Sequence, residues 1–308
     1  APAPDRKIRS AGAARRAHSG GWTGQCVKLA MPAQPSLDCI PDPGRVTPGA
    51  ALSVPIAGPE RDPAAGLAPD IDRGIAAIDW HRVRQDLDTQ GAATIASLLS
   101  PLQCRELAAL YALDEGPAAG TFRSRVVMAR HGFGRGEYKY FSYPLPALID
   151  GLREALYSRL VPLANRWCAD MGLPADFPAR HADYLARCHA AGQKRQTPLL
   201  LQYGPDDYNC LHQDLYGDQV FPLQVVLLLS EPGRDFEGGE FVMTEQRPRM
   251  QSRPMVLAMR QGDAVVVAVS QRPVRGTRGV YRVTMRHGVS RVRSGLRHTA
   301  GIIFHDAS

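Results

Sequence analysis

The sequence predicts an α+β fold, a double-stranded β-helix (jelly-roll) with a layer of helices on its N-terminal side. Two observations predict it. From Asp79 to about residue 196, apolar residues recur at three- and four-residue spacing, which is typical of amphipathic helices. From Thr197 onward, short β-rich segments alternate with glycine and proline, which indicates many short strands. Short strands at this regular spacing are typical of jelly-rolls and barrels.

The first part of the chain has a different composition. Residues 1–72 are rich in alanine, proline, glycine and arginine and show neither helical nor strand periodicity. Such a segment buries too little apolar surface to offset the entropy of ordering, so we predict a disordered tail. A single folded domain is expected over residues 73–308, with its helical part at about 73–196 and its jelly-roll at about 197–308.

Capping residues mark the expected helices. Asp79 is a candidate N-cap for a helix that ends at Gly91, and Ser100 before Pro101 predicts the start of a second helix. Two longer segments continue the helical pattern, "LPALIDGLREALYSRLVPLANRWCADMG" and "FPARHADYLARCHAAG". Pro162 is expected to bend the first of them.

Seven segments are predicted as strands: "TPLLLQY", "FPLQVVLLLS", "GEFVMT", "MVLAM", "DAVVVAV", "VYRVTMRHGV" and "RHTAGIIFH". The "EGGEF" sequence between two of them is interpreted as a turn in which Gly238 or Gly239 takes a positive φ. The longest apolar runs are strand-sized and far shorter than the roughly 20 residues of a membrane helix. We therefore expect a soluble protein without a membrane span.

The cysteine pattern and the charge distribution narrow the class of protein and its possible partners. The six cysteines form no CxxC pair and no secretion signal is visible, which favours reduced thiols and a cytoplasmic location. The net charge is +7, and residues 246–300 hold twelve arginines and a single acid, Asp263. This basic balance permits a polyanionic partner such as nucleic acid.

Three residues form a candidate metal site. The segment "NCLHQDLYGD" contains His212 and Asp214, and "MRHGVSRVRSG" supplies His287, 73 residues beyond Asp214. Two histidines and one carboxylate on one face of a barrel form the donor set of non-haem Fe(II), which leaves positions open for a bidentate co-substrate and O₂. Zinc is the alternative metal, because Cys210 shares strand parity with His212 and Asp214.

A second group of residues predicts an anion pocket. Arg297 lies ten residues beyond His287, and Thr299 points to the same face of the predicted strand. Tyr203 ends the strand "LLLQY", nine residues before His212. Guanidinium, hydroxyl and phenol can together hold the far carboxylate of 2-oxoglutarate, whose keto-acid end would chelate the iron.

Several motifs resemble a known superfamily. "YGPDDYNCLHQD", "DFEGGEFVM", "QGDAVVV" and "RHGVSRVRSGLRHT" are similar to Fe(II)/2-oxoglutarate dioxygenases of the prolyl-hydroxylase and AlkB-like kind. Over residues from about 75 to 308 the chain resembles more closely the bacterial Oxygenase-NA family, with departures at Gln196 and Ala300. This resemblance implies Fe(II), 2-oxoglutarate and O₂ as cofactors and the oxidative demethylation of damaged bases, a DNA-repair reaction.

The expected substrate residues lie in three segments. The segment "ARHGFGRGEYKYF" is either an ordinary hairpin or a lid over the substrate. In a lid, an aromatic residue would stack on a base: Tyr138, Tyr140 or Phe141. The basic residues would contact phosphates: Arg130, Arg135 and Lys139. Arginines of two further segments are expected to bind phosphates. They are Arg247, Arg249 and Arg253 in "EQRPRMQSR", and Arg272, Arg275 and Arg278 in "RPVRGTR".

Other interpretations stay open at this point. The alternative function is a hydroxylase of prolyl or other protein side chains or of a free amino acid, because the same iron site serves that reaction. A binding protein without turnover is disfavoured because all three expected metal ligands are present. His189 and His305 are interpreted as structural residues.

Overall fold

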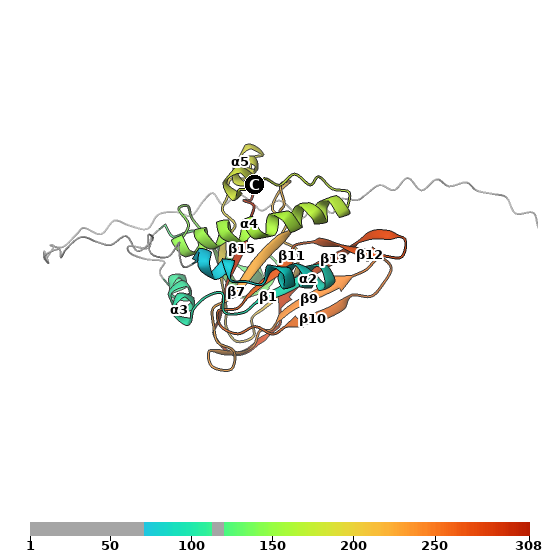
Figure 1. Ribbon diagram of the computed structural model, residues 1–308. Coiled ribbons are helices and arrows are strands. Elements are labelled where there is room, and N and C mark those ends of the chain that lie inside the picture. Colours follow the sequence, from blue (N-terminus) through green and yellow to red (C-terminus); the bar gives the residue numbers. More distant parts are fainter. Residues whose placement is uncertain (1–70, 113–119) are drawn as a thin grey trace, which may run out of the picture. The chain divides into compact units, whose positions relative to one another are not determined.

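The computed structural model describes residues 71–112 and 120–308. The described part combines helices with antiparallel sheets (Figure 1), and the predicted fold class is confirmed. The predicted disordered tail over residues 1–72 lies outside the described residues, apart from residues 71 and 72, which belong to a helical segment over 71–76.

The predicted capping residues begin and end the helices as expected. Helix α2 (Trp80–Gln90) is capped by Asp79, whose side chain accepts a hydrogen bond from the backbone of Arg82, and it ends at Gly91 with φ 76°. Helix α3 (Pro101–Ala109) starts with a capping box in which Ser100 and Gln103 bond each other's backbone amides. Helix α4 (Ala147–Asp170) is continuous through Pro162, and α5 (His181–Ala190) follows it.

Two main sheets form the barrel. The major sheet has the order β1 (Ala92–Ile95), β11 (Ala264–Ala268), β7 (Leu223–Leu228), β15 (Arg297–Ile303), β5 (Leu199–Tyr203), β4 (Glu137–Phe141), β2 (Phe122–Val127). The minor sheet has the order β10 (Arg253–Leu257), β9 (Phe241–Gln246), β13 (Gly279–Val289), β6 (Tyr208–His212), β3 (Gly134–Arg135), with β12 (Gln271–Gly276) paired to β13. A small third sheet joins β14 (Val292–Gly295) to β8 (Phe236–Gly238).

The segment expected to be helical also supplies strands. β1, β2, β3 and β4 all lie before residue 197, and three of them extend the major sheet at its edges. The alternation in β4 is hidden because both of its faces are buried: Tyr138 and Tyr140 lie on one face, and Lys139 and Phe141 on the other. A strand buried on both faces shows no alternation of apolar and polar residues, so its sequence does not reveal it.

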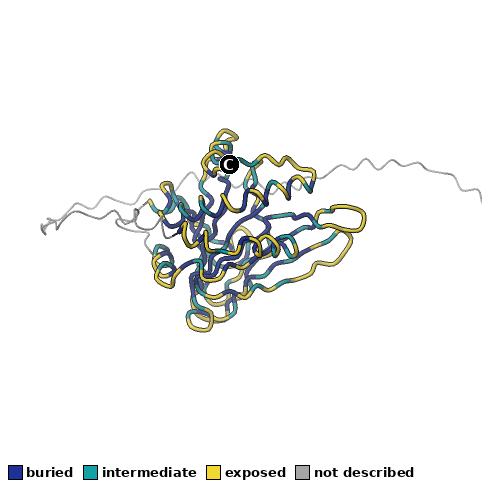
Figure 2. Tube along the Cα trace, viewed as in Figure 1, coloured by how far each residue is buried: buried dark blue, intermediate teal, exposed yellow. Residues whose placement is uncertain are grey.

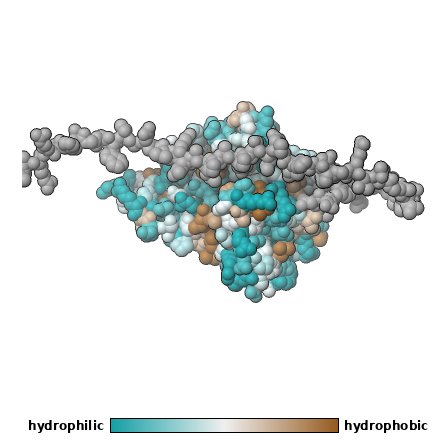
Figure 3. All heavy atoms as spheres, turned by 180° about the vertical axis from the view of Figure 1, so that it is seen from behind, coloured by the Kyte–Doolittle hydropathy of each residue, from teal (hydrophilic) through white to brown (hydrophobic). Residues whose placement is uncertain are grey.

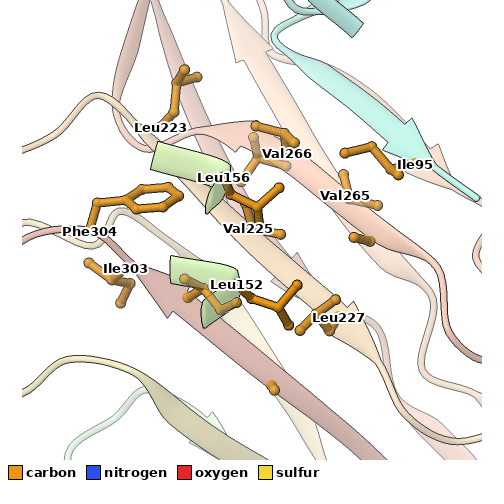
Figure 4. Packing of buried hydrophobic residues seen from close by; sticks show 14 of the residues in the cluster. Ile95, Leu152, Leu156, Leu223, Val225, Leu227, Val265, Val266, Ile303 and Phe304 are labelled. Carbon is orange, nitrogen blue, oxygen red and sulfur yellow. The ribbon is translucent and has the colours of Figure 1, made fainter. Parts of the chain in front are cut away.

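The main core lies between α4 and the major sheet. Leu152 and Leu156 of α4 lie beside Val225 and Leu227 of β7 and Val266 of β11 (Figure 4). Buried residues concentrate where the helices meet the strands, while hairpin ends and loops are exposed (Figure 2). Side chains alternate along a strand, so the β7 residues next to Val225 and Leu227 in the chain point the other way, into the barrel. Gln224 is one of them.

A buried ion pair attaches the C-terminal segment to α4. Arg153 and Asp306 are both almost fully buried, and Arg153 Nη2 lies 2.9 Å from Asp306 Oδ1. The other carboxylate oxygen, Oδ2, accepts a hydrogen bond from the Tyr143 hydroxyl at 3.0 Å and lies 2.8 Å from His189 Nε2. His305 Nδ1 accepts a bond from the backbone amide of Phe221 at 3.3 Å. Both histidines thus have structural contacts.

Among the described helices, none has the length and apolar composition that crossing a membrane requires. On the face seen in Figure 3, apolar residues form small patches among hydrophilic ones.

Candidate metal centre

Strand pairing brings the predicted metal ligands together. The register of β13 and β6 places His287 directly opposite His212, with the ring centroids 4.3 Å apart. Asp214 follows the end of β6; its Oδ1 lies 3.5 Å from His212 Nε2 and its Oδ2 lies 3.3 Å from His287 Nε2. One possible ligand atom from each of the three residues lies within 4.8 Å of the others.

The protonation of these groups suits metal binding. Burial alone would raise the pKa of Asp214, but His212, His287 and the Tyr216 hydroxyl outweigh it and hold the pKa below its usual range. Burial, with His287 nearby, lowers the pKa of His212. His212 Nδ1 lies 2.8 Å from the carbonyl oxygen of Cys210, so Nδ1 carries the proton and the lone pair of Nε2 faces Asp214.

The donor set fits ferrous iron better than zinc. Two imidazoles and one carboxylate hold Fe(II) without filling its coordination sphere. A zinc site of the expected kind needs the Cys210 thiolate, yet Cys210 is exposed and its sulfur is not part of the cluster of possible ligand atoms. The described residues therefore favour the predicted iron ligands.

Two neighbours of His287 were not found from the sequence. Gln224 is 2% exposed, and its Nε2 lies 3.0 Å from His287 Nε2, while its Oε1 has no hydrogen-bond partner in the described residues. Phe241 lies nearly parallel to the His287 ring, at 5.8 Å between centroids. A single glutamine inside the apolar run "PLQVVLLL" was an available signal, because a polar residue in a buried strand needs a polar partner.

The predicted anion pocket contains a buried cation without a counter-ion. Arg297 is 1% exposed, pairs with Tyr203 in the β15–β5 register, and lies 5.5 Å from the Tyr203 ring centroid. Its Nε and Nη1 have no hydrogen-bond partner, and no carboxylate of the described residues lies within ion-pair distance. Burial lowers the pKa of Arg297 to about 10, which still leaves the guanidinium charged at neutral pH.

The surroundings of Arg297 leave donors available for an anion. Asn209 Nδ2 donates to the Tyr203 hydroxyl oxygen at 3.4 Å, so the phenol proton is free to bond a ligand. Thr299 is 2% exposed and lies on the same face of β15 as Arg297. Gly238 and Gly239 both take a positive φ, as predicted for that turn, and a Cβ at Gly239 would lie only 2.8 Å from Arg297 Cδ.

The expected cofactors therefore fit the residues present. Fe(II) fits the His, Asp and His donors, and a carboxylate of 2-oxoglutarate fits the orphaned guanidinium and the neighbouring hydroxyls. Iron held by these three residues would have positions left for the keto-acid end of 2-oxoglutarate and for O₂.

The structure corrects the aromatic part of the substrate prediction. Tyr138 and Tyr140 are 8% and 5% exposed and point into the barrel, so neither ring offers a free face to a base. Phe141 is fully buried and stacks on Phe122 at 5.0 Å. Lys139 is 3% exposed and donates to the carbonyl oxygen of Tyr111 at 2.8 Å, so it cannot meet a phosphate.

The predicted arginines divide into buried and exposed groups. Arg272 is 1% exposed; it bonds the carbonyl oxygens of Asp88 and Thr89 and pairs with buried Glu245, so its predicted phosphate contact is wrong. Arg247 and Arg253 also pair with Glu245, at 3.0 and 3.6 Å, but are partly exposed. The remaining predicted arginines are exposed: Arg130, Arg135, Arg249, Arg275 and Arg278.

Comparison with known proteins agrees with this geometry. Residues 136–307, more than half of the chain, match the Oxygenase-NA family, described as "Oxygenase, catalysing oxidative methylation of damaged DNA". An uncharacterized protein of Mycobacterium tuberculosis (strain ATCC 25618 / H37Rv) is 48% identical over 198 residues, which cover 62% of this chain and 85% of that protein.

Solved structures with low identity are also similar. A Pseudomonas putida prolyl-4-hydroxylase is 16% identical with a TM-score of 0.42, and the match covers 74% of this chain and 99% of that one. A 2OG-Fe(II) oxygenase family oxidoreductase from Burkholderia pseudomallei is 17% identical with a TM-score of 0.43, covering 75% and 94%. By the extent of the family match, the chain belongs to the Oxygenase-NA family and is an oxygenase.

Proposed function

We propose that this oxygenase uses Fe(II), 2-oxoglutarate and O₂ to hydroxylate or demethylate damaged bases of nucleic acid, with His212, Asp214 and His287 as the metal ligands. The observation that carries the proposal is the combination, in one barrel, of this donor set with the buried and unpaired guanidinium of Arg297. The description of the family supports a DNA substrate.

Each part of the site has a role in this reaction. Bound iron would supply O₂ activation, with 2-oxoglutarate as the reductant that loses CO₂ and leaves as succinate. Arg297 and Tyr203 would hold the far carboxylate of 2-oxoglutarate, with Thr299 as a further donor. Phe241 packs against the His287 ring and limits its rotation, while the Gln224 amide contacts Nε2, the ring nitrogen that faces Asp214.

Basic residues near the metal centre support an anionic substrate. Glu245 lies two positions along β9 from Met243, the partner of His287 in the β9–β13 register, so it is roughly 7 Å along the strand on the same face. Arg247 and Arg253 surround Glu245 and line a pocket of about 200 Å³ with Met250. Exposed arginines at hairpin ends, Arg249, Arg275 and Arg278, are available to contact phosphates.

Replacing His212 or Asp214 by alanine is expected to abolish Fe(II) binding while the barrel stays folded, because both side chains lie at the site and outside the main core. Anaerobic competition with a chromophoric chelator measures the affinity, and circular dichroism checks the fold. His81→Ala, at an exposed position of α2, is the control. Unchanged iron affinity in both variants would refute the proposed ligand set.

Arg297→Ala is expected to raise the Kd of 2-oxoglutarate about tenfold to a hundredfold, because a hydrogen bond to a charged group contributes roughly 1.5 to 3 kcal/mol. Iron affinity should not change. The anaerobic charge-transfer band of the Fe(II)–2-oxoglutarate complex measures this Kd. Arg153→Ala removes an equally buried arginine that has a carboxylate partner; it should lower the melting temperature and leave the Kd alone. An unaltered Kd in Arg297→Ala would show that the carboxylate of 2-oxoglutarate binds elsewhere.

Single-stranded DNA binding is expected to weaken steeply with salt, because phosphate contacts release counter-ions. A variant with Arg249, Arg275 and Arg278 all changed to alanine should flatten the slope of log K against log salt by about 0.7 for each arginine that binds a phosphate in the wild type. Fluorescence anisotropy at several salt concentrations gives the slope. The control changes three exposed arginines on helices, Arg84, Arg105 and Arg159. Equal slopes for both variants would exclude a specific role of the hairpin arginines.

The substrate class is tested by turnover. Formaldehyde release from N-methylated oligonucleotides and hydroxylation of proline-containing peptides are measured side by side, with succinate as the common product. We expect formaldehyde from the oligonucleotides and no hydroxylated peptide. Turnover on peptides or free amino acids with none on nucleic acid would establish the alternative hydroxylase function.

A further inference from the structure

We propose that Tyr216 is a positioning residue for the Asp214 carboxylate, and that Tyr140 and Tyr138 support it in a hydrogen-bonded series along the barrel interior. The inference rests on the proposed metal centre and adds three residues to it. None of the three touches the reacting atoms in this role; they act through Asp214.

The contact between Tyr216 and Asp214 decides which carboxylate oxygen can bind a metal. The Tyr216 hydroxyl donates to Asp214 Oδ1 at 2.7 Å. Asp214 Oδ2, the other oxygen, lies 3.3 Å from His287 Nε2, while Oδ1 also lies 3.5 Å from His212 Nε2. Because Oδ1 already accepts the short bond from the phenol, a metal between the two histidines would bind Asp214 through Oδ2. A single carboxylate ligand atom keeps open the third coordination position that a facial site needs.

The loop that carries Tyr216 is held by one buried amide. Gln193 is 1% exposed, and the two hydrogens on its Nε2 are shared among three carbonyl oxygens, those of Tyr216 and Gln219 at 3.1 Å and that of Asp306 at 2.6 Å. Its Oε1 accepts from the backbone amide of Gln219 at 2.6 Å. Gly217 has φ 115°, and a Cβ there would lie 2.5 Å from Gln193 Cδ. The phenol is therefore placed by the loop and does not depend on the metal.

Two more tyrosines continue the series. The side chains of Tyr140 and Tyr138 follow Tyr216 along the barrel interior, and we infer one hydrogen bond between Tyr140 and Tyr216 and another between Tyr138 and Tyr140. The rings of Tyr138 and Tyr140 lie 5.3 Å apart at an angle of 87°. Both come from the inner face of β4, whose partner across the sheet is β5.

The direction of the bonds follows from the number of protons. An ionised carboxylate only accepts hydrogen bonds, so the single proton of Tyr216 goes to Asp214. Tyr216 then accepts from Tyr140, and Tyr140 accepts from Tyr138. Each donation strengthens the next one, so the series concentrates hydrogen-bond donation on one oxygen of Asp214.

The test compares metal binding in the wild type, Tyr216→Phe, Tyr140→Phe and the double variant. Anaerobic chelator competition gives the Fe(II) and Co(II) affinities, and the absorption bands of bound Co(II) report its coordination number. Tyr157→Phe is the matched control, because it removes a buried hydroxyl with an equally short bond of 2.7 Å, to the carbonyl oxygen of Pro178.

Tyr216→Phe is expected to weaken metal binding about tenfold, the usual effect of losing a partner of a metal ligand, and to shift the Co(II) bands toward a higher coordination number. Tyr140→Phe should have a smaller effect of the same kind. The double variant should match Tyr216→Phe, because Tyr140 acts only through Tyr216. Tyr157→Phe should bind metal as the wild type does.

The outcomes separate this inference from the proposed function. A wild type that binds neither metal, or an Asp214→Ala variant that binds as well as wild type, refutes the metal centre itself. A functional wild-type centre with unchanged affinity and Co(II) bands in Tyr216→Phe refutes the positioning role, and so does an equal loss in Tyr157→Phe. If Tyr216→Phe does not fold, Tyr140→Phe decides: altered Co(II) bands support the series, and unaltered bands overturn it.

Discussion

The pairing of β6 with β13 is the constraint on which the rest of the site depends. His212 and His287 are 75 residues apart in the chain, and only their antiparallel register places them opposite each other. A slip of one residue would turn His287 to the outer face of the barrel. β9 pairs with the other side of β13, with Met243 opposite His287, and so holds the strand from both sides. The proposed metal ligands thus owe their position to backbone hydrogen bonds, while the contacts of Tyr216, Gln224 and Phe241 affect only the orientation of their side chains.

Local and periodic signals predicted much of the fold and part of the site. The caps at Asp79 and Ser100 and seven of the eleven strands after residue 197 follow from residue type and spacing. The donor set that non-haem iron needs pointed to His212, Asp214 and His287, which the structure brings together. Contacts between residues far apart in the chain could not be predicted from the sequence. Tyr216 meets a glutamine before β5 and a tyrosine of β4, and no periodicity links segments so far apart. The tyrosines of β4 were assigned to a base-stacking lid or an ordinary hairpin, because a strand buried on both faces shows no alternation that would reveal its burial.

Charge density along the chain proved a poor guide to charge on the surface. The arginine-rich stretch from residue 246 to 300 begins directly after Glu245, and that one carboxylate pairs with Arg247, Arg253 and Arg272. Arg297 lies inside the barrel. The anionic partner proposed for this surface therefore depends on fewer arginines than the sequence contains, chiefly those at exposed hairpin ends.

The buried guanidinium of Arg297 also couples the stability of the domain to the binding of an anion. A buried charge without a counter-ion costs free energy in the empty domain, and a dicarboxylate that occupies the pocket removes that cost. A ligand that binds only the native state adds about 2.7 kcal/mol of stability at a hundred times its Kd. With the proposed co-substrate bound in this pocket, the folded domain would resist heat and proteolysis better, and this effect would grow with the concentration of free co-substrate.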